Sequence, residues 1–125
     1  GSWPAPNVIE AAAGAGVSVL SLSADQIKKT KRTKLVIPAG TYKGQVTPIT
    51  TTSLPVVAYS TTRMNAATAY ALTKTYWTEK SNMGSKANWW NGVGRGLMSN
   101  IKGKIHPGAL KYYTEAGFSI TKSQR

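Results

Sequence analysis

The stretch Lys34–Gln45, with the sequence KLVIPAGTYKGQ, decides the fold that we predict for this chain. Its apolar run, Leu35–Ile37, favours a short β-strand, and Pro38 ends that strand because proline has no backbone N–H to donate. The two glycines of the GTYKG segment permit backbone angles that a Cβ resists. The pattern therefore predicts a strand followed by a tight turn that holds Tyr42 in place.

The rest of the chain is predicted to form further short helices and strands. Helices are expected at Val8–Ala13, after the capping-box pair Ser23 and Gln26, from Met64 to Tyr76 with Asn65 as cap, and over Ala109–Ala116. Strands are expected at Val17–Leu22 and Ser53–Ser60, with Val46–Thr52 as a connection between elements. Gly117 is expected to close the last helix in a left-handed conformation, and the residues from Ser119 onward are expected to fray.

Composition excludes several kinds of chemistry. The 125 residues amount to one domain, and they contain no cysteine, so disulfides, thiolate catalysis and zinc–thiolate sites are excluded. His106 is the only histidine, which excludes a multi-histidine metal cluster. The four acids, Glu10, Asp25, Glu79 and Glu115, lie far apart in the sequence. We therefore expect neither an enzyme nor a metal or cofactor site.

The net charge points to anionic partners. Sixteen Lys and Arg against four Asp and Glu give a formal charge of +12, which attracts polyanions, anionic lipid headgroups and small anions. No apolar run approaches the roughly 20 residues that span a bilayer. We expect a soluble chain whose export signal, if there is one, lies outside this sequence.

A basic segment follows the second predicted helix. Five cations occupy seven positions, namely Lys28, Lys29, Lys31, Arg32 and Lys34. One interpretation is a nucleic-acid patch or an import signal. The other is a solvated helix end, where cations also interact favourably with the helix dipole. The second interpretation is favoured, because no aromatic or glycine residue interrupts the run as a single-strand binding surface would require.

The glycines after the paired tryptophans do not form a nucleotide motif. Gly92, Gly94 and Gly96 follow Trp89 and Trp90, and a helix leads into them. A dinucleotide fingerprint needs another glycine spacing, placed between a strand and a helix. We predict a hinge or loop here rather than a phosphate cradle.

Three segments resemble the C-terminal portion of a known family. They are Gly1–Pro4 (GSWP) before a helix, Ile37–Gln45 (IPAGTYKGQ) and Ile105–Gly117 (IHPGALKYYTEAG). In this order they are similar to the TAXI family, the TRAP-associated extracytoplasmic solute receptors. The likeness extends from Gly1 to about Phe118.

The resemblance implies an α/β fold of the type II periplasmic-binding-protein class, of which this chain is the C-terminal part. Residues 1–22 would then end one lobe, and residues 23–60 would form a basic helix and the crossing or hinge strands. Residues 61–118 would form the C-terminal helices, and residues 119–125 a frayed tail.

The resemblance also implies a function without catalysis or cofactors. Such receptors are periplasmic or otherwise extracytoplasmic, bind a small carboxylate such as glutamate, and deliver it to TRAP membrane permease subunits. Ser2 and Trp3 would contact the ligand at the amino end of a helix, where free N–H groups favour an anion. Tyr42 is a further candidate, although its turn can equally be a rigid part of a hinge.

The chain departs from the family in two ways. The family is much longer, so we expect this chain to lack the amino-terminal portion that supplies much of one lobe and half of the cleft, and to be either a fragment or an independent module. It also carries Val46–Pro48 and Asn65–Ala67 where the family usually has acids. A partner lobe or another copy of the chain is then needed to complete the fold.

Two alternatives stay open beside the receptor. The first is a polyanion- or nucleic-acid-binding module that uses the basic segment. The second is a self-assembling structural subunit, whose copies join through unpaired strand edges such as Ser53–Tyr59.

Overall fold

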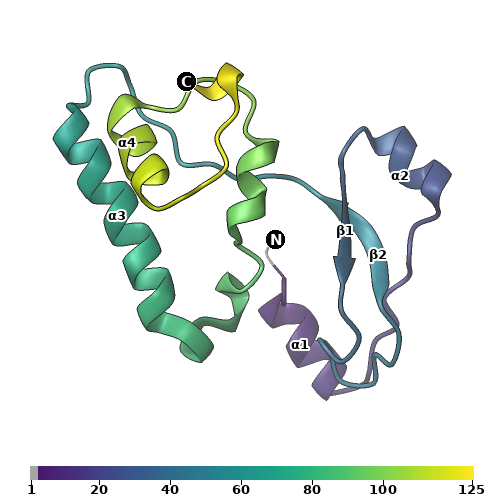
Figure 1. Ribbon diagram of the computed structural model, residues 1–125. Helices are drawn as coiled ribbons and strands as arrows, with labels where there is room; N and C mark the ends of the chain where they lie inside the picture. The colour runs from purple at the N-terminus through teal and green to yellow at the C-terminus, as the bar shows by residue number, and fades with distance from the viewer. Residues whose placement is uncertain (1–2) are drawn as a thin grey trace. The chain divides into compact units, whose positions relative to one another are not determined.

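The computed structural model describes residues 3–125, and the chain divides into two compact units (Figure 1). Unit 1 comprises Gly1–Leu54 and Asn88–Gly92, and unit 2 comprises Pro55–Ala87 and Val93–Arg125. Within the described residues, unit 1 contains helices and a pair of strands, whereas unit 2 is built from helices. No helix among residues 3–125 is both long and apolar enough to cross a membrane.

Unit 1 is organised around an antiparallel strand pair. Its elements are α1 (Pro6–Ala13), α2 (Ala24–Thr30), β1 (Thr33–Ile37) and β2 (Ile49–Ser53). The register places Thr33 opposite Ser53 and Ile37 opposite Ile49. The predicted strand is confirmed, and it ends directly before Pro38, as the missing N–H requires.

The turn after β1 is held by one glutamine side chain. Gly40 and Gly44 have φ angles of 77° and 80°, which confirms that the turn uses left-handed backbone. The Gln45 Nε2 donates to the carbonyls of Pro38 (2.9 Å) and Thr47 (2.8 Å), while its Oε1 accepts the Tyr42 N–H at 3.1 Å. These bonds fix the loop from within.

The core of unit 1 is small. It consists of Ala12, Ile37, Tyr42 and Ile49, with Trp3, Val8 and Leu35 partly buried against it. One face of α1, the end of β1 and the start of β2 therefore meet around the Tyr42 ring.

The capping box at the start of α2 is confirmed. The Ser23 hydroxyl accepts the Gln26 N–H at 3.3 Å, and the Gln26 Oε1 accepts the Ser23 N–H at 2.8 Å. The helix ends at Lys31, whose φ of 54° is left-handed. Lys31 and Arg32 follow α2, and Lys34 occupies an exposed position in β1.

The strand predicted at Val17–Leu22 was wrong. This segment is extended but makes only one backbone bond to its neighbour, from the Leu22 N–H to the Thr50 carbonyl at 2.8 Å. The Thr50 N–H donates instead to the Ser21 hydroxyl at 3.0 Å. A side-chain oxygen has replaced a backbone carbonyl, so the ladder does not continue.

The second predicted strand was displaced along the chain. β2 occupies Ile49–Ser53, which apart from Ser53 lies in the segment expected to be a connection, and residues 54–60 form no strand. Threonine favours strands because its branched Cβ fits a pleated surface, and Pro55 cannot donate to a ladder. The expected assembly through a strand edge at Ser53–Tyr59 thereby loses its structural basis.

Unit 2 is built on two packed helices. They are α3 (Ala66–Met83) and α4 (Pro107–Glu115), which lie side by side (Figure 1). The 3-10 helices η2 (Arg95–Asn100) and η3 (Lys122–Gln124) also belong to this unit, and η1 (Gly84–Trp90) is kinked at Ala87, where the chain passes into unit 1. The expected Asn65 cap is confirmed, since its Oδ1 accepts the Thr68 N–H at 2.8 Å.

The approach of α4 to α3 depends on glycine. A Cβ at Gly108 would overlap the Ala66 carbonyl oxygen and lie 2.9 Å from the Ala69 Cβ. His106 caps α4 beside it, because its Nδ1 accepts the Gly108 N–H at 3.2 Å. Its Nε2 therefore carries the proton and donates to the Met64 carbonyl at 3.0 Å. Both ring nitrogens of His106 therefore take part in hydrogen bonds that link the start of α4 to the residue before the cap of α3.

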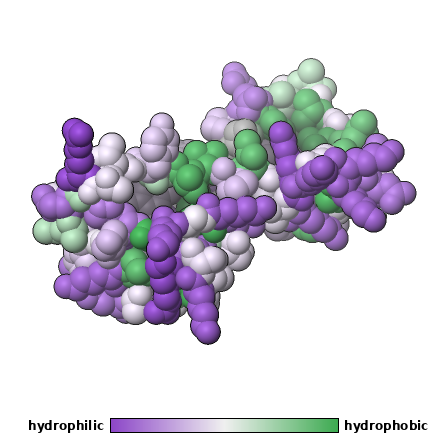
Figure 2. Space-filling view, turned by 90° about the horizontal axis from the view of Figure 1, so that it is seen from above, coloured by the Kyte–Doolittle hydropathy of each residue, from purple (hydrophilic) through white to green (hydrophobic). Residues whose placement is uncertain are grey.

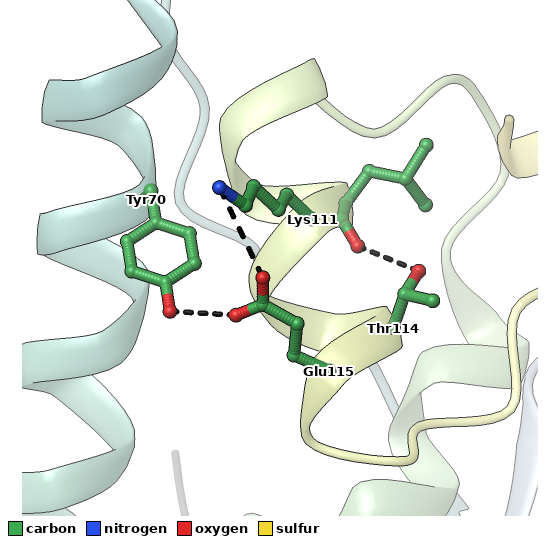
Figure 3. Close-up of polar contacts among 5 residues, drawn as sticks. Tyr70, Lys111, Thr114 and Glu115 are labelled. Atoms are coloured by element: carbon green, nitrogen blue, oxygen red, sulfur yellow. Dashed lines mark hydrogen bonds and ion pairs between the residues drawn. The ribbon is translucent and has the colours of Figure 1, made fainter.

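A polar contact joins the same helices further along (Figure 3). The Tyr70 hydroxyl on α3 donates to the Glu115 carboxylate on α4 at 2.6 Å. The Lys111 Nζ lies 4.0 Å from the other Glu115 oxygen and 5.4 Å from the centre of the Tyr70 ring. The hydrogen bond to Glu115 raises the pKa of Tyr70 above its ordinary value of 10.0, and partial burial and the Glu115 charge act in the same direction.

The C-terminal residues are ordered, in contrast to the frayed tail that we expected. Gln124 is only 1% exposed, and its Nε2 donates to the carbonyls of Met98 (2.7 Å) and Ile101 (2.9 Å). The Ile105 N–H donates in turn to the Gln124 carbonyl at 2.8 Å. The buried Gln124 amide thus hydrogen-bonds the C-terminal residues to η2 and to the residue that follows it.

Replacing Gly108 with alanine tests the helix contact. We expect Gly108→Ala to lower the free energy of unfolding by about 1–3 kcal/mol or more, since the added methyl meets backbone that cannot move aside easily. The matched control is Gly96→Ala, because a Cβ at Gly96 meets nothing within 4 Å. Urea denaturation of the three proteins measures the effect. Equal losses in both variants would contradict the close approach.

The pH dependence of the Tyr70 contact is a second test. Because folding raises this pKa, the contact stabilises the protein at pH values below about 10 and is lost as the pH rises through the folded pKa. The difference in phenolate absorbance between the wild-type protein and Tyr70→Phe should show a midpoint above 10.0. Glu115→Gln should lower this midpoint. A midpoint unmoved by Glu115→Gln would show that the carboxylate is not the cause.

Candidate functional site

Trp3, which the resemblance implies as a ligand contact, lies just before the amino end of α1. It is half-buried and packs against the core of unit 1. The N-cap residue, Ala5, has extended backbone and no side-chain capping bond, so no side chain caps the first N–H groups of α1. Ser2, the other predicted contact at this end, lies outside the described residues.

A distant segment of the chain comes against Trp3 within unit 1. A Cβ at Gly92 would lie 2.7 Å from the Trp3 carbonyl oxygen and 3.2 Å from its Nε1. Only glycine therefore allows the segment Asn88–Gly92 to approach so closely. From the sequence we predicted only a hinge or loop around this glycine, and the only signal of its role was its place after two tryptophans.

The same segment brings an aromatic surface into unit 1. The rings of Trp89 and Trp90 are stacked, with their centres 5.2 Å apart and their planes 9° from parallel. Trp89 is 46% exposed, whereas Trp90 is half-buried. Flat, partly exposed rings of this kind can bind the apolar part of a solute.

Tyr42 is placed at the same helix end, but from inside the core. Its side chain is only 7% exposed, and its hydroxyl oxygen accepts the Ala5 N–H at 3.1 Å. The turn after β1 is thereby joined to the start of α1. A tyrosine hydroxyl that accepts one bond still has its own hydrogen to donate. Trp3 and Tyr42, which lie far apart in the sequence, thus flank one helix start.

The basic segment forms a separate surface. Lys28, Lys29, Lys31, Arg32 and Lys34 are all exposed. In the part of the chain that the structure describes, the ion pair within 4.0 Å joins Lys111 to Glu115 and involves none of these five cations. Among the same residues, no three histidine, cysteine or acidic side chains lie close enough together to hold a metal ion.

Removing the Tyr42 hydroxyl tests the link between the turn and α1. We expect Tyr42→Phe to lower the free energy of unfolding by about 1 kcal/mol, because a partly buried N–H loses its acceptor. Tyr59→Phe is the control, since Tyr59 is 94% exposed. Chemical denaturation gives both values. An effect of Tyr42→Phe no larger than that of the control would contradict the link.

Comparison with known proteins identifies the family. The model of the NMT1-like family matches residues 1–117, nearly the whole chain. This is a family of periplasmic solute-binding proteins with a periplasmic-binding-protein-like fold, and its members are binding proteins rather than enzymes. No curated protein matches the chain. The mixed helices and strand pair of unit 1, and the helix start beside Trp3, accord with that fold. The chain therefore belongs to the NMT1-like family.

Proposed function

We propose that the chain contacts the ligand in an extracytoplasmic receptor of the TAXI type, which binds a small carboxylate such as glutamate and passes it to TRAP permease subunits. The observation that carries this proposal is the meeting of Trp3 and Tyr42 at the start of α1. Membership of a solute-binding family supports it. The predicted division into residues 1–22, 23–60 and 61–118 as parts of two lobes belongs to the same proposal.

The electrostatics of this helix end suit an anion. The helix dipole places partial positive charge at the start of α1, and no acidic side chain lies in its first turn. The formal charge of +12 adds a long-range attraction. In the first turn of α1, Pro6 has no N–H and the Val8 N–H already donates to the Ala5 carbonyl at 3.0 Å. A carboxylate would therefore accept hydrogen bonds from the Asn7 N–H and from the Tyr42 hydroxyl, while Trp3 covers its apolar part.

Exposed apolar side chains support a partner for this chain. Figure 2 shows hydrophobic side chains at the surface among hydrophilic ones. In the segment after β2, Leu54 is 65% exposed, Val56 is 92% exposed and Tyr59 is 94% exposed. Apolar surface of this kind commonly marks a contact with other polypeptide. In the proposed receptor, a further lobe or another copy of the chain covers it.

Thermal melting tests the proposal. The chain and a version extended at its amino terminus by a receptor lobe are melted with a panel of small carboxylates that includes glutamate. We expect the Tm of the extended version to rise by several degrees, because ligand at about 100 times its Kd adds about 2.7 kcal/mol of stability. Trp3→Ala should remove most of this rise.

The control for Trp3→Ala is Leu72→Ala, which truncates an apolar side chain on α3 of unit 2 that is 57% exposed. It should leave the rise in Tm intact. The proposal is wrong if no carboxylate raises the Tm of either version, or if Trp3→Ala and Leu72→Ala behave alike.

A second candidate function is polyanion binding by the basic segment. The observation that favours it is that all five cations are exposed and that none has an acid within 4.0 Å among residues 3–125. The same melts include a single-stranded oligonucleotide as an additional arm. Stabilisation by the oligonucleotide that disappears between low and moderate salt, without any effect of carboxylates, would favour this function over the receptor.

A further inference from the structure

Unit 2 contains a cavity that the proposed ligand site does not use. Its volume is about 260 Å³, enough for a small organic molecule. The residues that matter for its chemistry are Trp77, Lys80, Ser81, Arg95, Tyr112 and Phe118. They come from α3, from η2, from α4 and from the residue that follows the turn after α4. The cavity thus combines two cations with three aromatic rings.

Arg95 is held in position by two contacts. Its Nη1 donates to the Ala116 carbonyl at 2.8 Å, and its guanidinium carbon lies 4.7 Å from the centre of the Phe118 ring. These contacts fix the plane of the guanidinium but use only part of its hydrogen-bonding capacity, since the group has five N–H donors. Donors that are already oriented bind an anion at a lower cost in side-chain entropy.

No acid neutralises this cavity. Lys80 is half-buried, and neither Lys80 nor Arg95 has an acid within 4.0 Å among residues 3–125. Among the residues that the structure describes, no Asp or Glu lines the cavity. The Ser81 hydroxyl donates to the Trp77 carbonyl at 3.0 Å, so its oxygen is held at the wall. Two cationic side chains that line one partly enclosed space favour an anionic occupant.

The walls of the cavity suit a flat apolar group. The Trp77 and Phe118 rings meet edge to face with their centres 4.9 Å apart, and Phe118 is only 8% exposed. Tyr112 adds a third ring, whose centre lies 6.5 Å from that of Phe118. An inorganic anion would leave the partly exposed Trp77 and Tyr112 rings uncovered, whereas a ring or short hydrocarbon would bury them.

We propose that this cavity binds a small organic carboxylate with an aromatic or similarly flat apolar body. Its carboxylate pairs with Arg95 and Lys80, and its body lies against Trp77 and Tyr112. The site belongs to unit 2 and Trp3 belongs to unit 1, so this inference goes beyond the proposed function and does not depend on it.

Calorimetric titration of the full chain tests the inference with three probes. Benzoate has both the charge and the ring, acetate has only the charge, and benzyl alcohol has only the ring. We expect benzoate to bind more tightly than either of the other two. Lys80→Gln should weaken benzoate binding by about tenfold, because a charge-assisted hydrogen bond is lost.

The matched control is Lys74→Gln, which removes the same charge from an exposed position of α3 that does not line the cavity. It should leave benzoate binding within about twofold of the wild-type value, since an exposed charge is screened by salt. Arg95→Gln also removes the bond to Ala116 and can destabilise the fold, so Lys80→Gln decides the result. Full benzoate binding by Lys80→Gln overturns the inference.

Other outcomes also overturn it. They are the absence of benzoate binding, equal binding of acetate or benzyl alcohol, and tighter binding of inorganic phosphate. None of these results bears on Trp3, because the proposed receptor function is tested by the melting of the extended chain.

Discussion

The hydrogen bond from the Ala5 N–H to the Tyr42 hydroxyl is the contact on which the candidate ligand site depends. It joins the start of α1 to the turn after β1, and the Tyr42 ring fills the centre of the small core of unit 1. Gln45 holds that turn rigid from within. The Tyr42 side chain therefore contacts the core, belongs to the turn and hydrogen-bonds the helix start. The position of Trp3 depends on all three.

Close backbone approach is the second constraint, and glycine makes it possible in both units. Gly92 brings the tryptophan segment against Trp3, and Gly108 brings α4 against α3. In each place a Cβ would meet another part of the chain, so the two segments can pack this closely only because glycine has no side chain. A solute-binding protein needs such fixed approaches, because preorganised contacts reduce the entropy lost on binding.

The two units carry positive charge in different ways. The five cations around the end of α2 are exposed to water, where salt screens them. Arg95 and Lys80 line a cavity beside aromatic rings, where screening is weaker, and contacts with Ala116 and Phe118 hold the Arg95 guanidinium in place. The formal charge of +12 therefore says little about ligand binding until each cation is placed.

The sequence by itself determined the local structure: the strand before Pro38, the glycine turn, the Ser23 capping box and the closure of the last helix, because these depend on neighbouring residues. It also placed Trp3 at a helix start. Only the tertiary structure decided that β2 forms at Ile49–Ser53, that Gly92 contacts Trp3 and that Gln124 fastens the tail. Those outcomes depend on which distant groups supply hydrogen bonds and packing, and no local pattern contains that information.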